Sequence, residues 1–192
     1  MPASVFDFTL AQFRNALAGT QIILEEADRH IRASGQSPDG LLEARLQADM
    51  LPLAFQIGQA VNSSAGALRR IKGESVTALY VFDDFSAARA GIADALAYCK
   101  SVDASEFSGM EERAVIWTAP KIELRYTATE FLVTHAIPNF YFHCAAIYCI
   151  LRTLGVPIGK LNFLGRSNSR QEAGPRGAAL AALEAMAAKH SK

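Results

Sequence analysis

The chain has 192 residues, of which 51% are hydrophobic and 20% are charged, so it can form one domain with a hydrophobic core. Lysine plus arginine equals aspartate plus glutamate at 19 each, so no net field attracts nucleic acid or an anionic membrane. The first residues carry no leader-like pattern, and the longest apolar run is too short to span a bilayer. We therefore expect a cytoplasmic protein without a nucleic-acid or membrane partner.

The first predicted helix covers about residues 6 to 31. Its apolar positions alternate steps of four and three, which is typical of one buried seam on a long helix. The seam consists of Phe6, Leu10, Phe13, Leu17, Thr20, Leu24, Ala27 and Ile31. Ser34 and Gly35 then provide a stop signal. A loop follows, with a short helical piece predicted at about residues 41 to 46.

Two further helices carry the same four-three rhythm. One is predicted over residues 50 to 71 and has Asp49 where an N-cap belongs. The other is predicted over residues 85 to 102, with Asp84 as its cap. Sustained four-three spacing in several helices favours the near-parallel packing of a helix bundle.

A change of period interrupts the helices at about residues 113 to 126. Residues 114 to 118 are β-branched and aromatic, and Ile122, Leu124 and Tyr126 then alternate with charged residues. This pattern predicts a small β-hairpin that lies on the bundle, because an isolated hairpin is marginal in water.

The fourth bundle helix is predicted to run from a capping box, Thr127 with Glu130, to about residue 154. Apolar residues cover nearly every side of it, so we expect it to be buried all round. The sequence thus predicts a mainly α-helical fold, a four-helix bundle with a hairpin before its last helix. We expect residues 1–165 to form this domain, and residues 166–192 to form an alanine-rich tail that is weakly helical or partly disordered.

Three polar residues stand out in the apolar fourth helix. His135, Asn139 and His143 are spaced four residues apart, a drift of about 80° around the axis, so they form one stripe that we expect to face the bundle interior. Pro138 cannot bond the carbonyl of Thr134, which predicts a kink or a local widening. The freed carbonyl beside these side chains predicts a compact polar pocket.

Two interpretations of this stripe stay open. In the first, His143 or His135 acts as a general base or hydrogen-bond donor and Asn139 orients a ligand. In the second, the stripe is a satisfied core network around the proline, because unpaired buried polar groups cost about 1–3 kcal/mol each.

Three other residues are candidates for ligand binding. Asp49 and Gln56, near the start of the second helix, are expected to face the stripe across the bundle, although a simple cap is the favoured interpretation of Asp49. Tyr141 joins them, although a core or interface role is the commoner one for tyrosine.

The residues themselves do not favour a metal centre. His135 and His143 are separated by about 12 Å of helix rise, whereas two ligands of one ion need nitrogens roughly 3 Å apart. We therefore assign no metal ligands and leave the cofactor unknown, with a divalent metal open but not favoured. Cys99, Cys144 and Cys149 form no C-x-x-C pair and are expected to be reduced and buried, with a catalytic thiol left open.

Several segments together carry a family resemblance. They are residues 49–53, 135–143, 148, 150–152, 155–156, 159–160 and 163–165. Over about residues 4 to 165 the chain resembles an uncharacterised bacterial family, known only as a domain of unknown function, within the DinB/YfiT-like superfamily.

The resemblance implies a DinB-like up-down four-helix bundle that is often a homodimer. The superfamily includes divalent-metal enzymes and thiol-cofactor-dependent transferases and isomerases. Its usual metal site has one histidine from the second helix and two at i, i+4 on a later helix. This sequence departs from that pattern, because its second helix has no histidine and its later helix has His135, Asn139 and His143 at double spacing.

Overall fold

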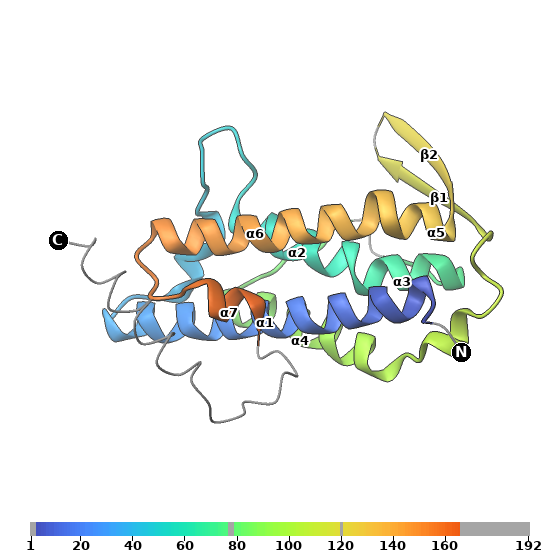
Figure 1. The fold of residues 1–192 in the computed structure, drawn as a ribbon. Helices are drawn as coiled ribbons and strands as arrows, with labels where there is room; N and C mark the ends of the chain where they lie inside the picture. The colour runs from blue at the N-terminus through green and yellow to red at the C-terminus, as the bar shows by residue number, and fades with distance from the viewer. Residues whose placement is uncertain (1–2, 77–78, 120, 166–192) are drawn as a thin grey trace, which may run out of the picture.

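Four long helical segments lie side by side and enclose the core in the computed structural model, which describes residues 3–76, 79–119 and 121–165 (Figure 1). They are α1 (Val5–Ala33), α2 (Leu53–Ser63) with α3 (Ala65–Lys72), α4 (Phe85–Ser101) and α6 (Ile137–Thr153). The short helices are η1 (Pro38–Glu43), η2 (Ala104–Phe107), α5 (Ala128–Glu130), the π-helical η3 (Phe131–Ala136) and α7 (Lys160–Leu164). The predicted mainly helical four-helix bundle with one small hairpin is confirmed.

Helix α1 follows its predicted seam and packs that seam into the core. Phe13 is fully buried and meets Phe140 of α6 edge-to-face, with ring centroids 4.9 Å apart. The helix ends at the predicted stop, where Gly35 adopts a left-handed φ of 76°. The short helical piece after it lies at Pro38–Glu43, slightly earlier than predicted.

The single second helix predicted over residues 50 to 71 is wrong in two respects. It begins only at Leu53, and Pro52 occupies the N-cap position, so the exposed Asp49 is not a cap. It also breaks at Ser64, whose hydroxyl donates to the Ala60 carbonyl at 2.6 Å and whose backbone leaves the helical region. The apolar rhythm conceals the break, because α3 buries its own residues against the same core.

Helix α4 agrees with the prediction at both ends. The carboxylate of Asp84 accepts a hydrogen bond from the Ala87 amide at 2.7 Å and so caps the helix. The helix buries Phe85, Ile92 and Cys99 against the core.

The last bundle helix is a continuous run through α5, η3 and α6, and its capping box is as predicted. Thr127 accepts from the Glu130 amide at 3.2 Å, and the Glu130 carboxylate accepts from the Thr127 amide at 2.8 Å. Just before Pro138, the Ile137 amide bonds to the carbonyl five residues back, that of Leu132. The predicted local widening is therefore present as a π-helical turn.

The hairpin pairs β1 (Ala114–Ala119) with β2 (Ile122–Thr127) and rises from the end of the bundle where the last helix begins (Figure 1). Val115 is buried, and Trp117 and Tyr126 pack partly buried against the core. Their shared face anchors the hairpin. Of the three alternating apolar residues on which the predicted strand rests, only Tyr126 packs against the core, because Ile122 and Leu124 are exposed.

Helix α7 turns back onto α1, a feature that the sequence pattern did not predict. Asn15 donates from its side chain to the Leu164 carbonyl at 2.8 Å. A Cβ at Gly19 would lie 2.5 Å from the Phe163 carbonyl oxygen, so only glycine permits this approach.

The expectations for residues 166–192 lie outside the described residues. Across the described chain, no helix is both long and apolar enough to cross a membrane.

Replacing Thr127 by alanine removes the oxygen that caps the last bundle helix. We expect the free energy of unfolding, measured by urea denaturation, to fall by about 1 kcal/mol. Thr118→Ala, at an exposed position of β1, is the matched control and should cost less than about 0.5 kcal/mol. Equal losses in the two variants would contradict a capping role for Thr127.

Candidate functional site

A hydrogen-bonded relay joins α6 to α2. Nδ1 of His143 lies 2.8 Å from Oε1 of Gln56, and Nε2 of Gln56 donates to the Leu51 carbonyl at 2.9 Å. A carbonyl only accepts, so the amide group of Gln56 faces Leu51 and its oxygen faces the imidazole. His143 must then donate from Nδ1. The relay therefore fixes a neutral tautomer in which Nε2 carries the lone pair.

The surroundings of His143 keep the imidazole uncharged. The residue is 9% exposed, and burial lowers its pKa to about 4. The rings of Phe55 and Phe142 meet it edge-on at 6.1 and 5.2 Å, and Phe142 itself is 58% exposed. Within the described chain no protein group bonds to Nε2, so this atom is the free acceptor of the relay.

His135 lies in a different environment, beneath the hairpin. Its Nδ1 is 3.3 Å from the Tyr126 hydroxyl, and its ring stacks on Phe131 at 5.4 Å and packs against Trp117 at 4.6 Å. Burial, and then the charge of Arg70, lower the pKa of His135.

The stripe is therefore divided between two neighbourhoods and does not form one compact pocket. His143 faces α2, whereas His135 faces the hairpin. Asn139, between them, donates from its side-chain amide to the backbone carbonyl of His135 at 2.7 Å. The side-chain amide of Asn139 thus gives a backbone carbonyl near Pro138 a hydrogen-bond partner.

The other candidates are also dispersed. The expectation that Gln56 faces the stripe agrees with its bond to His143. Asp49 is exposed on the loop before α2 and forms no hydrogen bond or ion pair within residues 3–76, 79–119 and 121–165. Tyr141 packs beside Phe140 at 5.5 Å, and burial raises the pKa of its hydroxyl.

Two of the three cysteines are inert at neutral pH. Cys99 and Cys144 are buried, and burial raises the pKa of each thiol to about 12. The open alternative of a catalytic thiol is therefore not supported at these two positions. Cys149 is partly exposed.

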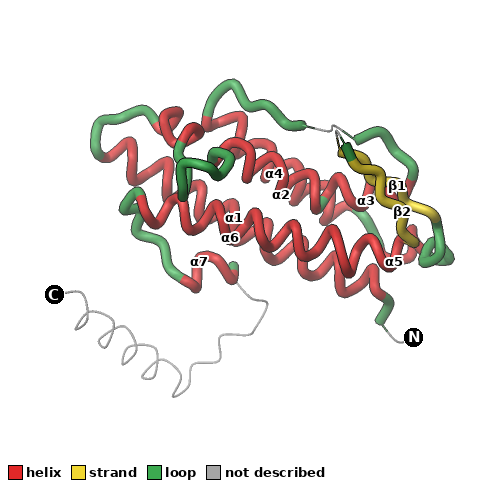
Figure 2. The backbone as a smooth tube through the Cα atoms, turned by 90° about the horizontal axis from the view of Figure 1, so that it is seen from above, coloured by secondary structure: helices red, strands yellow, loops and turns green. Residues whose placement is uncertain are grey.

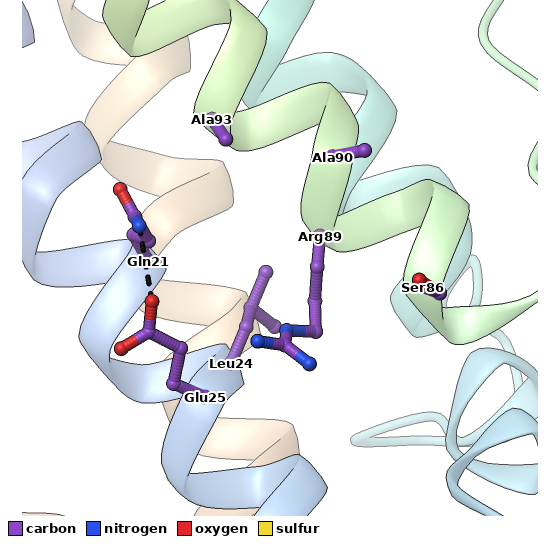
Figure 3. Close-up of a pocket in the computed structure, with 7 residues that line it drawn as sticks. All are labelled: Gln21, Leu24, Glu25, Ser86, Arg89, Ala90 and Ala93. Atoms are coloured by element: carbon purple, nitrogen blue, oxygen red, sulfur yellow. Dashed lines mark hydrogen bonds between the residues drawn. The ribbon is translucent and has the colours of Figure 1, made fainter.

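Two cavities lie elsewhere, along α1. The first, about 260 Å³, lies between α1 and α4 and is lined by Gln21, Glu25 and Arg89 among others (Figure 3). The second, about 610 Å³, shares Gln21 and Glu25 and extends to α7. In the first, the Gln21 amide donates to Glu25 at 3.0 Å, while Arg89 pairs with Asp28 at 3.3 Å. Neither cavity is lined by the polar stripe.

The donor set does not fit the three-histidine metal site that the resemblance implies. Within the described residues no cluster of three histidine, cysteine, aspartate or glutamate side chains could hold an ion. The second helix offers Gln56, which is occupied by its relay, and Asn139 is committed to a backbone carbonyl. Between α2 and α6, the lone pair on Nε2 of His143 is the one that remains for a metal ion among these side chains.

The comparisons with known proteins agree with this architecture. A crystal structure of a DinB family member from Shewanella denitrificans matches with a TM-score of 0.70 and 29% identity, over 87% of this chain and 95% of that one. The bundle, with its hairpin and last helix, is thus a DinB-like fold. The family model for a domain of unknown function, DUF1993, matches residues 5–164, and the chain belongs to that family. A comparison with curated proteins finds no match.

The low pKa of His143 links its burial to stability. The folded protein resists protonation until about pH 4, whereas the unfolded chain takes up the proton near the ordinary pKa of 6.5. The stabilisation is therefore fully present above about pH 6.5 and is lost as the pH falls toward 4.

Between about pH 7.5 and about pH 5, we expect the wild type to lose about 2 kcal/mol more than His143→Gln in urea denaturation. Identical pH dependence in the two proteins, or an NMR titration of His143 near 6.5, would contradict this.

Replacing Gln56 by methionine tests the relay. The variant keeps the volume of the side chain but leaves Nδ1 of His143 and the Leu51 carbonyl without partners. We expect a loss of about 1–3 kcal/mol in the free energy of unfolding. Gln59→Met, on the same helix but more exposed, is the control and should be near neutral. A neutral Gln56→Met would mean that the relay contributes nothing to stability.

Proposed function

We propose that the protein binds a small molecule between α2 and α6, with Nε2 of His143 accepting a hydrogen bond from the ligand. The relay through Gln56 to Leu51 carries the proposal, because it fixes one tautomer and leaves the lone pair of Nε2 available. Burial keeps the imidazole uncharged at neutral pH, which suits a neutral donor such as a hydroxyl, amide or thiol group.

The class of ligand that we favour is a thiol cofactor. The DinB-like resemblance implies transferases and isomerases that use such cofactors, and a thiol can donate to a neutral imidazole. A pKa of about 4 lies far below the usual thiol value of about 8.5, so His143 is a weak general base. It would orient the thiol rather than remove its proton. His135 lies beneath the hairpin and the side chain of Asn139 bonds its own helix, so neither contacts the ligand in this scheme.

We further propose that the site is a degenerate form of the superfamily's metal centre. Gln56 lies on the second bundle helix, where the resemblance implies a histidine ligand, and it bonds His143 directly. A direct bond between the two side chains replaces the bridge that an ion would supply. Ligand binding in this proposal needs no metal.

A second candidate function is a non-catalytic, dimeric binding or structural protein whose stripe is a core network. The low exposure of His143, 9%, and the bond of Asn139 to its own helix favour this candidate. The homodimer in this proposal is supported by the resemblance, which implies a fold that is often dimeric. Light scattering of the purified protein measures that assembly.

Thermal unfolding with glutathione, cysteine and coenzyme A tests ligand binding. For a true ligand at about a hundred times its Kd, we expect stabilisation of about 2.7 kcal/mol in the wild type and none in His143→Gln. His30→Gln, a histidine variant on α1, is the matched control and should respond like the wild type. If no thiol stabilises the wild type and His143→Gln only lowers its stability, the core-network candidate is correct.

Elemental analysis of the purified protein tests independence from metal. Stoichiometric zinc, nickel or manganese that disappears in His143→Gln would overturn a metal-free site.

A further inference from the structure

Arg70 is a half-buried cation that pairs with no carboxylate of residues 3–76, 79–119 and 121–165. Its guanidinium makes one long hydrogen bond, from Nη1 to the Asn62 carbonyl at 3.4 Å. No carboxylate in the described chain pairs with it. Burial lowers its pKa from the ordinary value, which marks the cost of holding this charge away from water.

The neighbouring cations on α3 are paired, which sets Arg70 apart. Arg69 bonds Glu74 at 3.2 Å and lies over the ring of Tyr98, with its guanidinium carbon 3.9 Å from the ring centroid. Lys72 bonds Glu106 at 2.6 Å. Both are near solvent, where pairing contributes little. Of these three cations on α3, Arg70 is the one that pairs with no carboxylate among the described residues.

One described hydrogen bond involves the guanidinium of Arg70. A guanidinium has five N–H donors in a fixed fork, and one weak bond uses only one of them. A Cβ at Gly66 would lie 2.8 Å from Oδ1 of Asn62, 3.1 Å from Cγ1 of Val76 and 3.4 Å from Nη1 of Arg70, so the absence of a side chain at Gly66 lets the guanidinium lie against α3.

An uncharged, polar and aromatic surface lies next to Arg70. Its charge acts on His135, which Trp117, Tyr126 and Phe131 surround with their rings. Helix α3 also contacts β1 of the hairpin. Within this group Arg70 is the one fixed charge, and it is positive. An anion would supply the missing counter-charge, and the imidazole and phenol could add hydrogen bonds.

We propose that Arg70, on the helix α3 that contacts β1 of the hairpin, anchors a second binding site, specific for a small carboxylate or phosphate anion. The site goes beyond the proposed function, because it uses neither His143 nor Gln56. The guanidinium fork would hold two oxygens of the anion, with His135 and Tyr126 beside it.

The fluorescence of Trp117 tests the site directly, because it is the protein's only tryptophan and packs 4.6 Å from His135. We would titrate the folded full-length chain with sodium phosphate and with sodium succinate, using sodium chloride at equal ionic strength as the blank. We expect a saturable change with at least one anion. The anion that saturates identifies the class of ligand.

Matched variants assign the response to Arg70. Arg70→Gln should weaken the binding about tenfold or more, since it removes a charge-assisted pair, while Arg69→Gln should bind like the wild type. His143→Gln should also keep the response, which separates this site from the thiol site. No saturable change with either anion in the wild type, or equal binding by Arg70→Gln, would overturn the proposal.

A second measurement does not depend on the folding of any variant. Bound anion offsets the repulsion between Arg70 and a protonated imidazole, so the pKa of His135 should rise in an NMR titration with the saturating anion. An unchanged pKa of His135 would contradict the predicted contact.

Discussion

The missing amide of Pro138 is the constraint on which the last bundle helix depends. Without that donor the chain cannot keep a regular ladder, and the turn before the proline widens into η3. The side-chain amide of Asn139 donates to the carbonyl of His135, and the backbone amide of Ile137 donates to the carbonyl of Leu132, five residues back. With these local adjustments one helix presents His135 to the hairpin and His143 to α2.

Much of the fold could be predicted because it follows from local patterns. The seams of α1 and α4, the Asp84 cap, the Thr127 capping box and the hairpin all depend on residues close in sequence. The break at Ser64 could not be predicted, because its hydroxyl satisfies a carbonyl within the same turn and the apolar rhythm continues beyond it. The return of α7 depends on contact with α1 across the fold, which no local pattern records.

The candidate site was only partly predictable, for a related reason. Helical spacing gave the stripe and the facing residue Gln56, but not which neighbours each stripe residue would meet. About 80° of drift and about 12 Å of rise are enough to set His135 and His143 against different elements. Arg70 gave no signal in the sequence, because its lack of a partner is a property of the folded chain alone. One helix thus contributes to two chemically distinct neighbourhoods. In each of them burial lowers the pKa of the imidazole.

The absence of a side chain at Gly19 allows α7 to pack directly against α1. Because a Cβ at Gly19 would collide with the backbone of α7, the return of α7 onto α1 depends on a residue of the first helix. Figure 2 shows α7 against the side of the bundle. The larger cavity is lined by residues of α7, α4 and the part of α1 near that glycine, so its shape depends on the same contact. A side chain at position 19 would therefore displace α7 and change the shape of this neighbouring cavity.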